Sequence, residues 1–192
     1  MVPTAIIIIH QIIFQGMFIA RNVTLRHKLG VPIRGKNREA TLSVAFFALF
    51  ILCAIVLSLF AAPVGRVTWL SETTAVSLTL GLLALDLLIS AASLLHLGSS
   101  WRVGVVEAQH TALVEDGIYR FSRNPYFFSY LVMFAAYTIL LQNLILLLLS
   151  LVGFALIHAM VLKEEKHLIN LHGDVYRQYR RRVPRYGGFW VK

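Results

Sequence analysis

Cysteine is almost absent from this chain, and charged residues are scarce. The sequence has one cysteine, Cys53, and only 14% of its 192 residues are charged. A lone cysteine inside an apolar run excludes a disulfide framework and a cysteine-based zinc site. With 58% hydrophobic residues and so few charges, the chain does not have the composition of an ordinary soluble domain. We therefore expect an integral membrane protein.

Acidic residues are particularly few. Nine aspartates and glutamates stand against 18 lysines and arginines, which gives a net charge of +9. In a soluble protein such an excess would suggest a nucleic-acid partner. Here the basic residues flank apolar runs, so anionic lipid head groups and membrane topology explain them better. We expect membrane lipids as partners, no nucleic acid and no metal.

Long apolar runs, by contrast, are plentiful. A helix needs about 20 mostly apolar residues to cross the hydrocarbon of a bilayer. Runs of this kind occupy 3–20, 41–62 and 74–97, and the stretch 126–162 is long enough for two helices divided at Gln142-Asn143. The first of those two arms is the shorter. The sequence thus predicts an all-α, polytopic membrane protein with about five transmembrane helices.

These runs organise the chain as a single membrane domain over 1–192. Three transmembrane helices fill 1–97, and 98–192 holds a helical hairpin and a polar tail. The N-terminal run follows no basic segment and precedes no small-residue cleavage site, so we expect a retained helix and not a signal peptide.

The distribution of lysine and arginine predicts the topology. The predicted loop 21–40 and the C-terminal tail are both rich in basic residues, whereas the short loop 63–73 carries only Arg66. The positive-inside rule then puts the N-terminus outside and the C-terminus in the cytoplasm, in what we expect to be a prokaryotic cytoplasmic membrane. Most of the remaining polar residues fall in 98–125 and 163–192, on the cytoplasmic side.

One polar motif stands where the fourth apolar stretch begins, in the sequence "YRFSRNPYFFSY" at 119–130. Pro125 keeps Asn124 out of the helical region and suits the first turn of a helix. Arg123, Asn124 and Pro125 therefore mark a helix N-terminus, whose free N–H groups can hold an anionic group. The alternative is that the arginines and tyrosines here are only interface anchors.

A second polar motif follows the last apolar stretch, in "VLKEEKHLINLHGDVYRQYRRRVPRYG" at 161–187. Glu164 and Glu165 are costly near a bilayer unless they have a role or a partner. They are either a carboxylate site for a cation at the membrane edge or part of a solvated face on a helix that continues into the cytoplasm.

Together the two motifs resemble the isoprenylcysteine carboxyl methyltransferase family, within a wider group that includes phospholipid methyltransferases. That family's pattern is Leu-Val-x-x-Gly-x-Tyr, then Arg-His-Pro-x-Tyr, then Glu-Glu-x-x-Leu with Gly-x-x-Tyr-x-x-Tyr downstream. The resemblance covers about the last half of the chain. The positions that match in register are Leu113, Val114, Gly117, Tyr119, Arg123, Pro125, Glu164, Glu165, Leu168, Gly173, Tyr176 and Tyr179.

The resemblance implies an enzyme that moves a methyl group from S-adenosylmethionine to a lipophilic or small acceptor. It implies that the cofactor lies in a cytoplasmic pocket between the helical hairpin and the tail. By residue-by-residue carry-over, the cofactor-binding positions are Thr111, Ala112, Leu113, Val114, Tyr119, Asn124, Pro125, Tyr126, Phe127 and Glu164. The catalytic positions expected are Glu164, Asn124 and Arg123, and those expected near the acceptor are Met160, His158 and Glu165.

Three positions depart from the family pattern. Asn124 replaces histidine, and an amide side chain cannot act as a proton-transferring base near neutral pH. Phe127 replaces tyrosine and loses a hydroxyl. Met160 replaces an arginine that the family associates with the substrate carboxylate, which argues against a prenylcysteine carboxylate as the acceptor. A phospholipid amine, a thiol or another carboxylate remains open, as does a non-enzymatic membrane protein that binds lipid or a partner.

Two further residues have alternative explanations. Asp86 lies near the middle of the third apolar run, where an ionisable side chain is costly unless it is paired or functional. Hydrogen bonding inside the bundle and a role at the substrate are both possible. Trp101 resembles a recurring feature of the family but is equally typical of an interface anchor.

Overall fold

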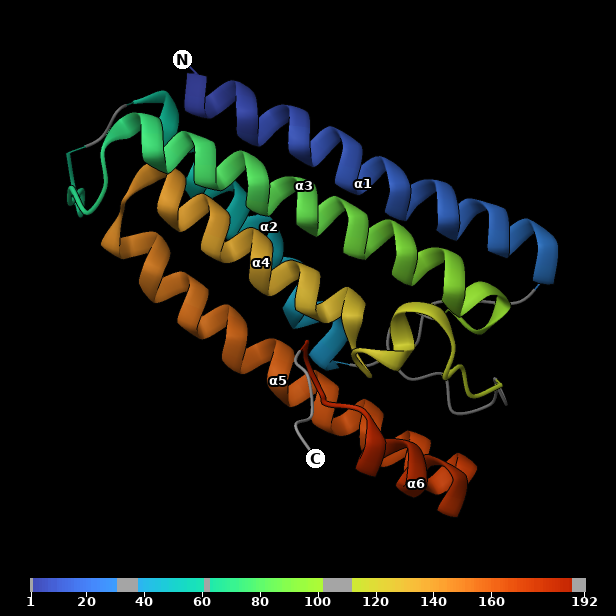
Figure 1. Cartoon of the computed structure of the whole chain (residues 1–192). Helices are drawn as coiled ribbons and strands as arrows, with labels where there is room; N and C mark the ends of the chain where they lie inside the picture. Colours follow the sequence, from blue (N-terminus) through green and yellow to red (C-terminus); the bar gives the residue numbers. More distant parts are fainter. Residues whose placement is uncertain (1, 31–37, 61–62, 102–111, 188–192) are drawn as a thin grey trace.

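The computed structural model describes residues 2–30, 38–60, 63–101 and 112–187, and within these ranges it contains helices and no β-strand (Figure 1). The elements, in chain order, are α1 (Val2–Leu29), α2 (Arg38–Leu59), α3 (Glu72–Leu97), the short 3-10 helices η1 (Gly98–Ser100) and η2 (Gly117–Arg120), α4 (Pro125–Leu141), α5 (Leu144–His172) and α6 (Asp174–Arg182).

Four of these helices, α1, α2, α3 and α5, are long and apolar enough to cross a membrane. Large apolar side chains such as Ile12, Leu52, Leu88 and Leu148 are exposed on their outer faces, as expected for contact with lipid. Helix α4 has 17 residues, or about 25 Å, and is slightly shorter than the hydrocarbon layer. The all-α, polytopic architecture is confirmed.

Helix α1 differs from expectation in its length. The prediction that a loop begins at residue 21 is wrong, because the helix continues to Leu29. No glycine or proline interrupts this basic stretch before Gly30, which takes a φ of 65° and ends the helix. Leu25 is buried on the added turns, and Arg21 donates a hydrogen bond to the carbonyl of Gly98. The extension therefore packs against the end of α3.

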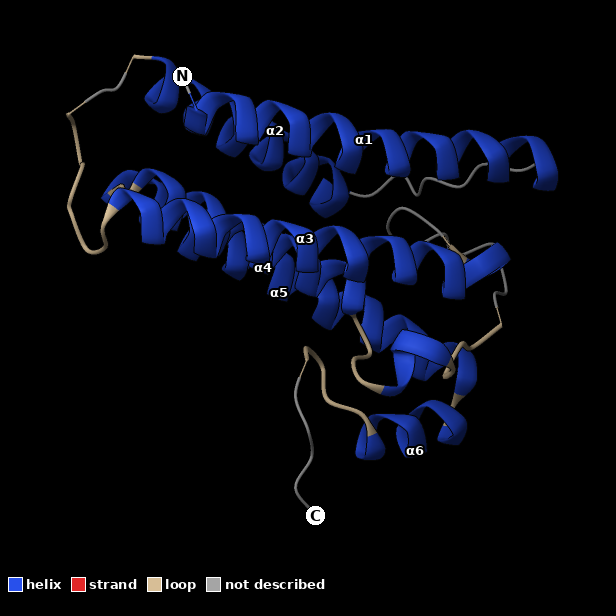
Figure 2. Cartoon of the chain, turned by 45° about the horizontal axis from the view of Figure 1, so that its top comes forward, coloured by secondary structure: helices blue, strands red, loops and turns tan. Residues whose placement is uncertain are grey.

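Helix α4 is the central helix of the bundle. It lies between α3 and α5 in both views of the ribbon (Figures 1 and 2), and ten of its 17 residues are buried. Its buried side chains share one apolar cluster with residues of α1, α2, α3 and α5. Helix α5 approaches closely at Gly153, where an added Cβ would lie 2.5 Å from Phe134 Cε2 and 2.9 Å from Phe46 Cε1.

The turn between α4 and α5 confirms the predicted division at Gln142-Asn143. Gln142 takes the left-handed conformation, with φ 44°, and its Oε1 accepts hydrogen bonds from the backbone N–H groups of Trp69 and Leu70, both at 2.7 Å. Asn143 Oδ1 caps α5 by accepting from Ile145 N at 2.8 Å. These polar side chains tie the hairpin to the segment before α3.

The other end of the hairpin is covered by the C-terminal tail. Helix α5 continues past the bundle, and α6 turns back along it (Figures 1 and 2). The chain after α6 then reaches the start of α4, where Arg123 N donates to Pro184 O at 2.9 Å. Segments about 60 residues apart in sequence are thereby joined at the end of the bundle where α4 begins.

Candidate active site

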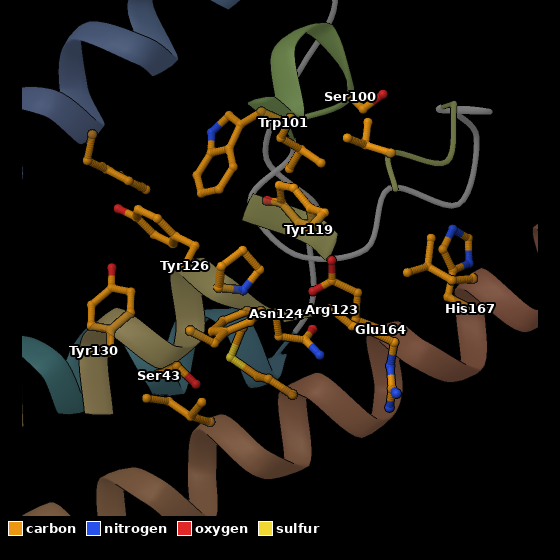
Figure 3. A pocket seen from close by; sticks show the side chains of 18 of the residues that line it. Ser43, Ser100, Trp101, Tyr119, Arg123, Asn124, Tyr126, Tyr130, Glu164 and His167 are labelled. Carbon is orange, nitrogen blue, oxygen red and sulfur yellow. The ribbon is translucent and has the colours of Figure 1, made fainter. Parts of the chain in front are cut away.

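A cavity of about 240 Å³ lies at the end of the bundle where α4 begins (Figure 3). Its walls come from α1, α2, α4, α5 and α6 and from the segments at 97–101 and 112–119. One ordered water needs only about 10–15 Å³ of such space, so this cavity can hold a far larger molecule. Most of the lining side chains are apolar, as in typical sites for small organic ligands.

Helix α5 presents different faces to the cavity and to the tail. Residues spaced by three or four, including Gly153, Ile157, Met160 and Glu164, line the cavity. Neighbouring residues on an α-helix point about 100° apart, so Glu165 lies on another face from Glu164. The two adjacent glutamates consequently have different surroundings.

Glu164 lies in the wall of the cavity, where no residue of the described ranges pairs with its carboxylate through a hydrogen bond or an ion pair. Figure 3 shows its carboxylate turned toward Tyr119. Burial raises the pKa of the Tyr119 hydroxyl, and the negative charge of Glu164 raises it further. Tyr119 therefore stays neutral. Because a neutral hydroxyl does not compensate a carboxylate, Glu164 remains available for a cationic group.

Glu165, in contrast, is 3% exposed and is the centre of an ion-pair cluster. Its Oε1 accepts from Arg123 Nη2 at 2.8 Å and Nε at 3.2 Å, and from Asn124 Nδ2 at 3.4 Å. Its Oε2 accepts from Arg185 Nη2 at 3.0 Å. Two arginines thus compensate one buried acid, which is the arrangement that a buried carboxylate requires.

The same cluster fixes the tail in place. Arg123 Nη1 donates to the carbonyls of Arg180 and Val183, and Asn124 Nδ2 donates to the carbonyl of Arg185. We call the Arg123, Glu165 and Arg185 side chains the tail clamp. Arg123 also borders the cavity, but its Nε, Nη1 and Nη2 all donate hydrogen bonds to Glu165 or to carbonyls of the tail.

The tail contributes two aromatic residues to the cavity wall. Tyr176 and Tyr179 of α6 line it, and the hydroxyl of Tyr179 donates to the carbonyl of Tyr119 at 2.7 Å. Burial raises the pKa of both tyrosines, so they act as neutral groups. The cavity is complete only when α6 is docked.

The structure brings most of the predicted site residues together at this cavity. Thr111 lies outside the described residues, and His158 and Glu165 are absent from the wall. His158 instead contacts the hydroxyl of Tyr186, with Nδ1 at 3.1 Å. The predicted residues that line the cavity are Ala112, Leu113, Val114, Tyr119, Arg123, Asn124, Pro125, Tyr126, Phe127, Met160 and Glu164.

Sequence reasoning did not assign any site residue to the first two helices. Helix α1 contributes Gln15 and Phe18, and the first turns of α2 contribute residues that include Ser43, Phe46 and Phe47. Apolar α2 gave no signal in sequence, but α1 did: two glutamines four residues apart interrupt an isoleucine-rich run. Trp101 also lines the cavity and donates its indole N–H to Asn22 at 2.8 Å.

The fold and the cavity define a multi-pass α-helical membrane protein with an internal cavity at one end of its bundle. The phospholipid methyltransferase family model matches residues 74–175, more than half of the chain. The chain therefore belongs to that family.

A curated relative supports the same grouping. Protein-S-isoprenylcysteine O-methyltransferase of Schizosaccharomyces pombe is 32% identical over 108 residues, which are 55% of this chain and 46% of that protein. The resemblance seen in the sequence is confirmed. The chain spans about half the length of this relative. The residues matched by the family model, 74–175, contain the α4–α5 hairpin.

Proposed function

We propose that the protein is a membrane methyltransferase that moves a methyl group from S-adenosylmethionine to a lipophilic acceptor. The observation that carries this proposal is the Glu164 carboxylate, which has no partner in the described part of the chain and lines a largely apolar cavity of small-molecule size. Membership of the phospholipid methyltransferase family supports it.

The residues around the cavity fit this cofactor. S-adenosylmethionine has a cationic sulfonium and a cationic amine, and Glu164 is a carboxylate without a partner among the described residues. The aromatic rings of Trp101 and Tyr119 are suited to contact an adenine, and the backbone at 112–114 offers polar edges. When bound, the cofactor supplies an electrophilic methyl group.

The chain's own contribution is to position the reactants and exclude water. The docked α6 closes one side of the cavity with Tyr176 and Tyr179, and the tail clamp holds it there. Fixing two reactants in a productive geometry is worth several kcal/mol of barrier, about 7–11 in favourable cases. None of the neutral tyrosines is needed as a base in this account.

The acceptor side of the cavity is apolar. Phe46 and Phe47 come from α2, and Ile157 and Met160 come from α5. Both helices expose apolar side chains on their outer faces, so an acceptor with a hydrocarbon chain suits this side. The relative's name includes isoprenylcysteine, but Met160 offers no charge for a carboxylate. The acceptor we favour is therefore lipophilic and is recognised through its chain and an uncharged contact.

The orientation follows from the same function. A water-soluble cofactor reaches the cavity from the cytoplasm if the C-terminal tail lies there and the N-terminus outside, as the positive-inside rule predicts. A prokaryotic cytoplasmic membrane and a single membrane domain over 1–192 complete the proposal.

The direct test is transfer of label from S-[methyl-³H]adenosylmethionine to a total lipid extract by the purified protein. We expect Glu164→Gln to lower the transfer rate at limiting cofactor about 10- to 150-fold, the range for one charge-assisted hydrogen bond. The matched control is Glu72→Gln, an exposed acid that pairs with Arg66 before α3. Equal rates in both variants would argue against the cofactor site, and absence of labelled lipid with the wild type would argue against the function.

A further inference from the structure

A chain of polar side chains crosses the apolar middle of the bundle. Asp86 of α3, His10 of α1 and Tyr137 of α4 are 0%, 4% and 0% exposed. His10 Nε2 lies 2.7 Å from Asp86 Oδ2, and His10 Nδ1 lies 2.8 Å from the Tyr137 hydroxyl. Ionisable residues at membrane depth are costly and are usually retained for a purpose.

The series of hydrogen-bonded side chains continues from these residues to the cavity. Gln11 Nε2 donates to the Tyr137 hydroxyl at 3.0 Å, and Gln15 Nε2 donates to Gln11 Oε1 at 3.4 Å. Gln15 in turn lines the cavity. Five side chains from three helices therefore connect a buried carboxylate to the wall of the proposed site.

Donors and acceptors follow one order along this series of side chains. Asp86 Oδ2 accepts a hydrogen bond from His10 Nε2–H, so His10 Nδ1 is the acceptor for the Tyr137 hydroxyl at 2.8 Å, and the contact of that hydroxyl with the Ile7 carbonyl is longer, at 3.4 Å. The tyrosine oxygen must accept from an N–H, so the Gln11 amide nitrogen faces it and the Gln11 oxygen faces Gln15. The Gln15 side-chain nitrogen is consequently the atom that donates to Gln11 Oε1.

This order leaves the Gln15 oxygen for the cavity. No residue in the described ranges donates to Gln15 Oε1. Hydrogen bonds in series polarise one another, so an amide that donates at its nitrogen becomes a better acceptor at its oxygen. The described part of α2 that faces the cavity adds apolar side chains and Ser43.

We propose that Gln15 is a specificity-determining residue whose side-chain oxygen accepts a hydrogen bond from the head group of the methyl acceptor. The residues Gln11, Tyr137, His10 and Asp86 act as positioning residues for it. An acceptor whose head group carries an N–H or O–H fits this oxygen. A carboxylate would place one acceptor atom against another, which is unfavourable without a proton between them. The inference rests on the proposed function.

The first test compares two lipids with the same chain length, hexadecylamine and palmitate, as acceptors. We expect the wild type to methylate the amine and to leave palmitate largely unmodified. The free amine, formed when the ammonium loses a proton to the buffer, attacks the methyl group, and S-adenosylhomocysteine leaves. Gln15→Leu should raise the KM for hexadecylamine at least about fivefold, the loss of one hydrogen bond, with the Kd of S-adenosylmethionine unchanged. The control, Ile12→Leu, alters a side chain that is 67% exposed on the outer face of α1, and it should leave both values unchanged.

A double-mutant cycle separates positioning from mere packing. Tyr137→Phe removes only the hydroxyl that joins His10 to Gln11. It should raise the KM for hexadecylamine in the wild-type background and have no further effect in Gln15→Leu, because that variant lacks the amide that the other side chains position. The same increase in KM in both backgrounds would show that Tyr137 acts through stability alone, and the positioning role given to Gln11, Tyr137, His10 and Asp86 would be wrong.

The outcomes distinguish this inference from the function it rests on. Binding of S-adenosylmethionine by the wild type, together with a preference for palmitate or with no methylation of hexadecylamine, would overturn the role of Gln15 and leave the cofactor site standing. Failure of the wild type to bind S-adenosylmethionine would overturn both.

Discussion

Replacing Glu165 with glutamine should release the C-terminal tail from the bundle. The wild-type carboxylate accepts hydrogen bonds from Arg123, Arg185 and Asn124, and the side chain of Arg123 is only 6% exposed. Glutamine keeps the shape and one acceptor oxygen but removes the charge that compensates two arginines. Charge-assisted hydrogen bonds contribute about 1.5–3 kcal/mol each, and breaking a buried ion pair costs about 3–5 kcal/mol. We expect the docked tail to lose about 2–3 kcal/mol, because a polar partner remains.

Amide hydrogen exchange measures this loss locally. The reporters are the amide of Arg123, which donates to Pro184 O, and the amide of Val183, which donates to Tyr179 O. A loss of about 2–3 kcal/mol corresponds to exchange faster by about 30- to 150-fold at these amides, with α3 and α4 unchanged.

The control for this experiment is Asp116→Asn, which breaks the exposed pair with Arg120. The two side chains are 83% and 68% exposed, so the variant should change exchange in the tail less than about threefold. If Glu165→Gln exchanged no faster than Asp116→Asn, the tail clamp would not be what holds α6 on the cavity.

Two further predictions concern the acceptor and the topology. The wild type should methylate N-acetyl-S-farnesylcysteine weakly or not at all, and Met160→Arg should gain this activity in an assay of tritiated methyl ester, whereas efficient methylation by the wild type would show that another residue supplies the charge. In a Cys53→Ala background, a membrane-impermeant maleimide added outside should label Val64→Cys and miss both Lys28→Cys and Arg181→Cys; labelling of either basic position would reverse the orientation.

The helices were predictable because each has a local cause in the sequence. Apolar runs, the proline at 125 and the polar pair Gln142-Asn143 give the helices and the hairpin, and the structure agrees. The end of α1 was not predictable in this way. A basic stretch resembles a loop by composition, but it stays helical when no breaker occurs before Gly30 and when Leu25 packs against the end of α3.

The candidate site was predictable only where the residues carry a family pattern. Tyr119, Arg123, Pro125 and Glu164 do, and all four line the cavity. The partner of Glu165 could not be inferred, because Arg185 is one of several arginines in the tail and only the fold selects it. The same holds for Asp86, since no pattern in the sequence pairs it with a histidine 76 residues away.

Binding of S-adenosylmethionine to the purified protein, measured by isothermal titration calorimetry in detergent, tests the central claim most directly. We predict saturable binding with one site per chain, and an affinity about 10- to 150-fold lower in Glu164→Ala, equivalent to the 1.5–3 kcal/mol of a charge-assisted hydrogen bond. The folded state of the variant is checked by its thermal unfolding. No binding by the wild type, or unchanged affinity in a folded Glu164→Ala variant, would contradict the account.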